Sequence, residues 1–148
     1  MTPDQIFSIA NTSTLVPWLL LVVVPRHRVT RIVAGTVAPA LFAAAYVIVV
    51  ATHFGQGKGD FQSLTGVAGL FSNPWILLAG WLHYLAFDLL VGNWEASDAR
   101  ARGIPHLLVV PSLVLTLMFG PAGWALYHAT RFSYRRFIAS PATPALSL

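Results

Sequence analysis

The chain has 148 residues, contains no cysteine and has few charged residues. The missing thiols exclude disulfide bonds, thiolate catalysis and cysteine-ligated metal sites. Charged residues make up only 9% of the sequence, against about 25% in a soluble domain, so little of this chain can form one. The histidines show no His-x-x-x-His or His-x-x-His-His spacing, which argues against a di-iron site of the membrane hydroxylase type. We expect no metal and no other cofactor.

Charges are missing above all from four long stretches. No Asp, Glu, Lys or Arg occurs in residues 5–25, 32–57, 61–87 and 103–130. Each stretch has at least the ~20 residues that a helix needs to cross the hydrocarbon core of a membrane. The sequence therefore predicts an all-α integral membrane protein, a four-transmembrane-helix bundle that forms one domain over residues 1–130. The predicted helices cover residues 5–24, 31–53, 74–94 and 105–129.

Prolines lie inside the predicted helices, where they remove a backbone donor and favour kinks. We expect proline kinks near Pro17 and Pro39, each of which frees one carbonyl group. The Gly-Pro-Ala-Gly segment at residues 120–123 is interpreted as a further kink at a packing contact. Pro121 frees the Leu117 carbonyl, and the glycines allow helices to approach closely.

The segments outside these helices are short. Residues 61–71 are mildly apolar and contain glycine, so we interpret them as an interfacial or re-entrant segment. Asn73 followed by Pro74 predicts a helix start, with a cap candidate and then proline at the first helical position. Residues 95–102 are interpreted as a polar loop, and residues 131–148 as a flexible tail that is basic and then rich in Pro, Ala and Ser.

Positive charge does not fix the orientation of a four-helix bundle with these boundaries. The first and third connecting loops would lie on one side and carry five arginines. Lys58 and the three arginines of the tail would lie on the other side. Five against four gives no bias under the positive-inside rule.

The arginines lie at the ends of the predicted helices, which is typical of residues that anchor in lipid headgroups. No basic stripe interleaved with aromatic residues supports nucleic-acid binding. The first helix begins almost at once, without a signal peptide or an Arg- and Ser-rich transit sequence. We therefore expect a bacterial inner membrane, or an intracytoplasmic photosynthetic membrane, as the location. The alternative is an organelle protein whose presequence has been removed.

The third predicted helix carries a carboxyl group in an apolar setting. A carboxylate at the bilayer centre costs roughly 2.5–3.5 kcal/mol on insertion scales, so Asp88 is the leading functional candidate. Trp81, Tyr84 and Asp88 are spaced i, i+3 and i+7 and share one helix face. His83 lies about 140° away from Asp88 around the helix axis, so these two side chains meet only if other helices bring them together.

Structural roles remain open for each of these residues. Asp88 lies near the end of the predicted helix and could form a structural hydrogen bond there. His83 could be a packing residue, and Trp81 and Tyr84 could belong to helix packing or to an aromatic belt. Asn11 could form an interhelical hydrogen bond.

Several motifs together resemble one family. They are Pro17-Trp18 in an Asn-containing span, Phe61-x-Ser-Leu-x-Gly-Val67, Gly80-Trp-x-His-Tyr-Leu-Ala-Phe-Asp-Leu89 with Gly92-x-Trp94, and Leu117-Met-Phe-Gly-Pro-x-Gly123. With them the chain resembles the abscisic-acid-deficient-four-like family of small four-helix membrane proteins, from about residue 7 to residue 127. The segment from Trp81 to Asp88 carries the most specific part of the resemblance.

The resemblance implies carotenoid metabolism, because the plant member of the family is required to make neoxanthin from violaxanthin. That conversion opens an epoxide and forms an allene without net redox change, so it needs an acid and a base. The candidate catalytic residues are Asp88, His83 and Tyr84. The candidate substrate-binding residues are Trp81, Asn11, Trp18 and Phe87.

Two classes of function follow. The first is a cofactor-independent carotenoid isomerase or epoxide-opening enzyme. The second is a non-catalytic subunit that binds a carotenoid or helps to assemble a membrane pigment–protein complex, with a homo-oligomer as a further possibility. The expected partners are a carotenoid or another lipid-soluble substrate and membrane lipids. A transporter has less support, since the sequence contains no inverted repeat.

Overall fold

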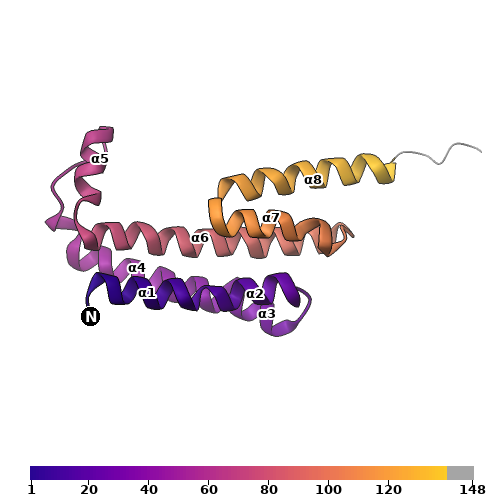
Figure 1. The fold of residues 1–148 in the computed structure, drawn as a ribbon, viewed down its shortest axis with the longest axis horizontal. Helices are drawn as coiled ribbons and strands as arrows, with labels where there is room; N and C mark the ends of the chain where they lie inside the picture. The colour runs from indigo at the N-terminus through magenta and orange to yellow at the C-terminus, as the bar shows by residue number, and fades with distance from the viewer. Residues whose placement is uncertain (140–148) are drawn as a thin grey trace, which may run out of the picture.

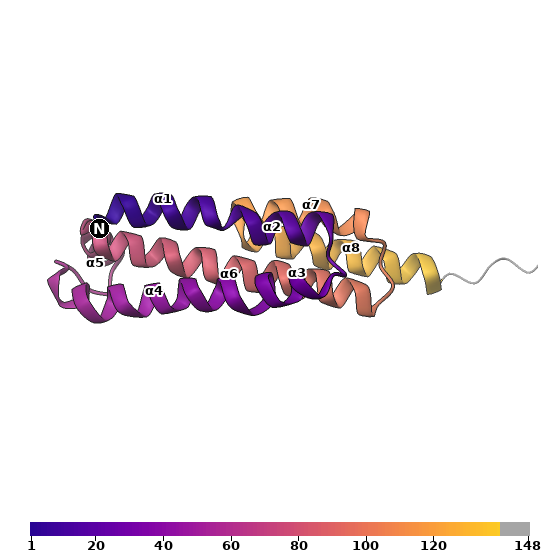
Figure 2. The same ribbon diagram turned by 90° about the horizontal axis from the view of Figure 1, so that it is seen from below.

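The computed structural model describes residues 1–139, and within this part of the chain all regular structure is helical. The helices are α1 Pro3–Ser13, α2 Leu15–Val23, α3 Arg28–Ile32, α4 Ala38–His53, α5 Leu64–Phe71, α6 Pro74–Ala101, α7 His106–Phe119 and α8 Pro121–Ala139. A π-helical turn (η1, Val33–Val37) joins α3 to α4, and a 3-10 turn (η2, Phe54–Gln56) follows α4. The long α6 is the central helix: α1–α2 and α3–α4 run along it, and α7 and α8 cover its C-terminal half (Figures 1 and 2).

Within residues 1–139, three helical segments are long and apolar enough to cross a membrane: Pro3–Val23, Arg28–Gln56 and Pro74–Ala101. They correspond to the first three predicted helices. The chain is therefore an all-helical membrane protein with three candidate membrane-spanning segments.

Proline shapes the first two of these segments. α1 ends at Ser13 and α2 begins at Leu15, so the helix breaks at Thr14, three residues before Pro17. Ahead of Pro39, the helix widens to the π-helical turn η1, and the Ala38 N–H donates to the Val33 carbonyl five residues back. A proline cannot supply the donor that the regular ladder requires, so the backbone rearranges on its N-terminal side.

The predicted fourth helix at 105–129 is not continuous. α7 ends at Phe119, the chain reverses at Gly120, and α8 runs back antiparallel to α7 (Figure 1). Gly120 has φ +47°, a left-handed conformation that favours glycine, and Pro121 starts the new helix. α7 has 14 residues, so it is about 21 Å long and shorter than a ~30 Å hydrocarbon core. The segment 120–123 is therefore a reversal rather than a kink.

Two further boundaries differ from the expected ones. The segment 95–102, predicted as a polar loop, continues α6 as far as Ala101, because no glycine or proline interrupts the chain between Asn93 and Arg102. The predicted tail is also helical at first, since α8 extends to Ala139. Residues 140–148 lie outside the described residues.

The predicted start of the third helix is confirmed. The Asn73 side chain accepts a hydrogen bond from the Trp75 N–H at 2.9 Å, and Pro74 occupies the first turn. The segment before it contains the short helix α5, which stands across the N-terminal end of α6 (Figure 1). The interfacial or re-entrant location expected for residues 61–71 stays a prediction.

Candidate functional site

A continuous row of aromatic and polar side chains follows one face of α6, as the helical spacing predicts. The ring of Trp81 packs against Phe7 of α1, with 5.4 Å between centroids, and against Tyr84, at 5.2 Å. The Tyr84 hydroxyl donates to the Leu117 carbonyl of α7 at 3.3 Å. Leu117 lies four residues before Pro121, which has no N–H to offer that carbonyl. The row therefore links α1, α6 and α7 near the middle of α6.

Asp88 lies on α6 one turn after Tyr84, and it faces Gly120 at the tip of the α7–α8 hairpin. Its side chain is buried beside the Tyr84 hydroxyl. A Cβ atom at Gly120 would lie 2.8 Å from Asp88 Oδ1, so only glycine lets the backbone approach this closely. Asp88 Oδ2 is buried and has no hydrogen-bond partner among residues 1–139. The carboxyl group thus keeps a buried acceptor atom that no described residue satisfies.

Glu95, two turns further along the same face, is a second buried carboxyl group that sequence reasoning missed. It has no exposed surface, and its Oε1 atom accepts a hydrogen bond from Thr116 Oγ1 at 2.9 Å. Its Oε2 atom has no partner within the described part of the chain. The signal was present in the spacing, because Glu95 follows Asp88 by seven residues with no proline between them.

The close packing of α7 and α8 explains how Thr116 reaches Glu95. A Cβ atom at Gly123 would overlap the backbone nitrogen and the Oγ1 atom of Thr116. Without a side chain at this position, α8 lies directly on α7 and both helices lie on α6. The two glycines of the Gly-Pro-Ala-Gly segment therefore position the hairpin against both carboxyl groups.

His83 is not brought to Asp88. Its side chain is exposed and packs edge-on against Phe87, with 4.4 Å between ring centroids, and near Tyr46 of α4, at 5.8 Å. No hydrogen bond among the described residues involves it. The structure thus groups Asp88 with Tyr84 and places His83 toward α4.

The other predicted substrate-binding residues fall into different surroundings. Trp81 belongs to the row, and its Nε1 donor is buried without a partner among the described residues. Trp18 is buried, and its ring fills the space that Gly92 leaves on α6, which is a packing role. Asn11 and Phe87 are exposed on the helix surface.

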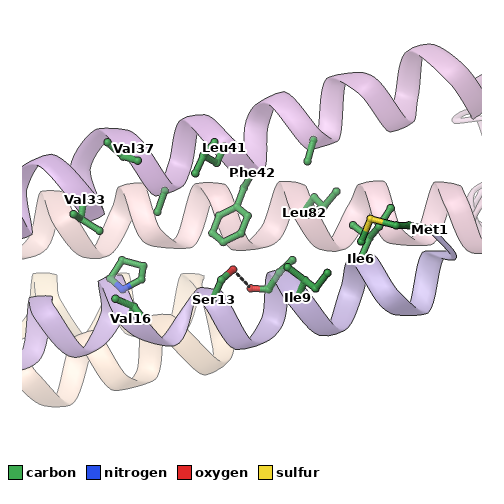
Figure 3. Close-up of a pocket in the computed structure, with 14 residues that line it drawn as sticks. Met1, Ile6, Ile9, Ser13, Val16, Val33, Val37, Leu41, Phe42 and Leu82 are labelled. Carbon is green, nitrogen blue, oxygen red and sulfur yellow. Dashed lines mark hydrogen bonds between the residues drawn. The ribbon is translucent and has the colours of Figure 1, made fainter.

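Two grooves flank α6. A smaller one of about 210 Å³ runs between α1 and the start of α6 and is bounded by Phe7, Leu78 and Trp81, among others. A larger one of about 460 Å³ lies between α1–α2 and η1–α4, with Leu82 as its only α6 residue (Figure 3). Its lining is almost entirely apolar, and the Ser13 hydroxyl at its edge donates to the Ala10 carbonyl. The smaller groove therefore meets the row at Trp81, and the larger one has no acidic or basic side chain in its lining.

The row offers proton-transfer groups in an apolar environment. A tyrosine hydroxyl, two carboxyl groups and an indole N–H lie along one helix face, and three of their atoms are buried and unpartnered within residues 1–139. Unpaired buried polar atoms cost free energy, so such a set is typical of a site that binds a polar part of a ligand. No group of three or more His, Asp or Glu side chains that could hold a metal ion occurs in the described chain.

Comparison with known proteins gives one curated relative and one family. The chain is 24% identical over 137 residues to "Protein ABA DEFICIENT 4, chloroplastic" of Arabidopsis thaliana, an alignment that covers 86% of this chain and 61% of the relative. The chain thus spans less than two thirds of the length of that relative. No solved structure matches it significantly. The ABA DEFICIENT 4-like profile matches residues 5–127, which run from the first turn of α1 into α8 and include both carboxyl groups, so the chain belongs to the ABA DEFICIENT 4-like family.

Proposed function

We propose that the protein acts in carotenoid metabolism and opens a xanthophyll epoxide at the Tyr84–Asp88 site. Family membership supports the pathway, since the plant member is required to make neoxanthin from violaxanthin. The observation that carries the site is the buried Asp88 beside the half-buried Tyr84. Trp81 lies next to them, has an N–H without a partner among residues 1–139, and borders a groove between α1 and α6.

The proposed reaction needs one proton given and one taken. The epoxide oxygen accepts a hydrogen bond from Trp81 and a proton from Tyr84 as one C–O bond breaks. Asp88 takes a proton from the adjacent polyene carbon, and the electron pair of that C–H bond forms the new double bond of the allene. The proton then passes from Asp88 to Tyr84, which restores both groups. No oxidant, reductant or metal enters this balance.

Asp88 and Tyr84 fit these roles better than Asp88 and His83. Tyr84 and Asp88 are neighbours on one face, whereas His83 faces α4 and lies against Phe87. General acid–base catalysis requires both groups within hydrogen-bond reach of the same substrate. His83 therefore drops out of the proposed mechanism.

The test is pigment analysis in a host that accumulates violaxanthin. We expect expression of the chain to produce an isomer of the same mass with an allenic absorption spectrum, separated by chromatography. Asp88→Asn and Tyr84→Phe should each lower its yield at least about 100-fold, the lower end of the range for loss of acid–base catalysis. His83→Gln is the matched control and should retain the yield. Equal product from Asp88→Asn and the unmodified chain, at equal membrane levels, would refute the proposal.

A second candidate function rests on the larger groove. Its apolar lining between α1–α2 and η1–α4 suits part of a long polyene without any chemistry (Figure 3). On this alternative the protein binds a carotenoid or helps to assemble a pigment–protein complex. Purification from pigmented cells distinguishes the two: the alternative requires unmodified pigment, or partner subunits, to remain with the protein, and Leu41→Trp in the groove should displace the pigment.

A further inference from the structure

The reversal at Gly120 gathers almost all positive charge at one end of the molecule. The chain has nine Lys and Arg residues. The α2–α3 turn and the α6–α7 turn lie at the same end, and α8 returns to that end (Figures 1 and 2). Eight arginines therefore share it: Arg26, Arg28, Arg31, Arg100, Arg102, Arg131, Arg135 and Arg136. Lys58 lies at the opposite end, beyond α4.

Side-chain contacts hold α8 in this direction. Asp98 near the end of α6 accepts a hydrogen bond from the Tyr127 hydroxyl at 2.6 Å and pairs with Arg131 at 3.4 Å and Arg102 at 2.8 Å. The Tyr134 hydroxyl also donates to the Gly103 carbonyl at 2.8 Å. Together these contacts join α8 to the end of α6 and to the turn that follows it.

The hairpin reaches only part of the way along α6. Its tip, Gly120, lies against Asp88, near the middle of the 28-residue α6. α7 is too short to cross the hydrocarbon core, and Met118 and Phe119 at the tip are each about 60% exposed. Exposed apolar side chains at mid-membrane depth suit contact with lipid tails. A hairpin of this depth enters and leaves a membrane through the same leaflet.

Some arginines at this end have partners within the protein, and others form no salt bridge with a described residue. Arg102 and Arg131 pair with Asp98, and Arg100 donates to the Pro25 carbonyl at 3.3 Å. The other five are exposed and form no salt bridge with a described residue. They are Arg26, Arg28, Arg31, Arg135 and Arg136. An exposed guanidinium group binds phosphate oxygens in a bidentate manner.

We propose that the arginine end lies on the non-translocated side of the membrane, where these five exposed arginines bind anionic phospholipid headgroups, and that α7–α8 is a re-entrant hairpin inserted from this side. Eight positive residues against one give a strong bias under the positive-inside rule, and clustered arginines next to a membrane favour anionic lipids. The proposal does not depend on the reaction at Asp88.

Single cysteines test the orientation cleanly, because the chain has none of its own. The variants are Gln62→Cys at the Lys58 end, Ala101→Cys at the arginine end, Ser133→Cys on α8 and Met118→Cys at the hairpin tip; all four positions are exposed. Each variant is produced in a bacterial inner membrane and treated with a membrane-impermeant maleimide before and after the membrane is opened.

We expect Gln62→Cys to react in intact spheroplasts. Ala101→Cys and Ser133→Cys should react only after opening, and Met118→Cys should react in neither case. Reaction of Ser133→Cys on the side opposite Ala101→Cys would overturn the hairpin, since it would show that residues 105–129 span the membrane. Reaction of Ala101→Cys in intact spheroplasts would overturn the orientation.

Thermal unfolding of the purified protein tests the lipid contact. We expect phosphatidylglycerol to raise the Tm in detergent more than phosphatidylcholine does. The variant Arg26→Gln/Arg28→Gln/Arg135→Gln/Arg136→Gln should lose at least half of that difference, and the control Lys58→Gln should keep it. An equal Tm rise with both lipids, or an unchanged difference in the fourfold variant, would overturn the headgroup assignment.

Discussion

The two sides of α6 hold their neighbours by different means. Toward α1–α2 and α4 the contacts along the middle of α6 are mainly apolar, with the Trp18 ring set on Gly92 and Leu82 on the floor of the larger groove. Toward α7–α8 the side chains in contact include two buried carboxyl groups and Tyr84, and the helix backbones approach at glycine. One helix thus supports an apolar surface and a polar one.

The difference between the two sides indicates which contacts specify helix packing within a membrane. Lipid tails are as apolar as leucine, so an apolar side gains little from a protein neighbour that it would not gain from lipid. A polar group that lacks a partner in hydrocarbon costs several kcal/mol, which specifies where α7–α8 must dock. The carboxyl side therefore fixes the register of the hairpin, and the apolar side can keep an open groove.

Gly123→Ala should have the largest effect on stability, because it separates α8 from α7 and from the polar side of α6. The new Cβ atom would overlap Thr116, whose backbone cannot move without breaking α7. We expect a loss above about 3 kcal/mol, beyond the usual range for overpacking, measured by thermal unfolding in detergent. Gly55→Ala is the matched control, since nothing lies within 4 Å of a Cβ atom there. Similar stability of the two variants would show that the hairpin does not depend on this close approach.

Truncation of leucines on α6 should then cost less stability beside the larger groove than in the packed core. Leu89 and Leu82 are both almost fully buried, but only Leu82 borders the larger groove. Leu89→Ala should cost about 3 kcal/mol, within the range for a buried leucine. Leu82→Ala should cost less than half as much, because it widens a groove that lipid or detergent can fill. Equal losses in the unfolding measurement would mean that the groove is closed in solution.

Sequence patterns predicted the parts of the fold that depend on local chemistry. The charge-free stretches located the first three membrane helices, and Asn73-Pro74 located the start of α6. The i, i+3, i+7 spacing placed Trp81, Tyr84 and Asp88 on one face. Each of these features is set by a few neighbouring residues.

The hairpin could not be predicted in the same way. A charge-free stretch at 103–130 satisfies either one spanning helix or two shorter helices, and Gly-Pro is compatible with a kink as well as with a reversal. The choice depends on Gly120 meeting Asp88 and Gly123 meeting Thr116, which are contacts between distant residues. The distribution of positive charge between the two ends could not be predicted either, since the direction of α8 decides at which end Arg131, Arg135 and Arg136 lie.

Thr116→Val should test whether the hydrogen bond from Thr116 to the buried Glu95 contributes to stability. The substitution conserves shape and removes the 2.9 Å hydrogen bond, so neither Glu95 oxygen has a described partner. Leaving a buried acceptor unpaired costs about 1–3 kcal/mol, which unfolding in detergent measures. Thr130→Val removes a hydroxyl that binds the Leu126 carbonyl of its own helix, and we expect little change there. A neutral Thr116→Val would indicate that another donor, such as water, satisfies Glu95.

Tyr127→Phe should have the smallest effect, and it tests which contact holds α8 on the polar side of α6. It removes only the hydroxyl that donates to Asp98, and it leaves both ion pairs of Asp98 and the buried ring in place. We expect a loss of about 1 kcal/mol, typical of one intramolecular hydrogen bond. Tyr134→Phe is the control, because its hydroxyl bond to Gly103 is exposed to solvent or headgroups and should contribute less. If Tyr134→Phe cost more than Tyr127→Phe, α8 would be held mainly by its exposed end, and the Tyr127–Asp98 contact would not be what directs the hairpin.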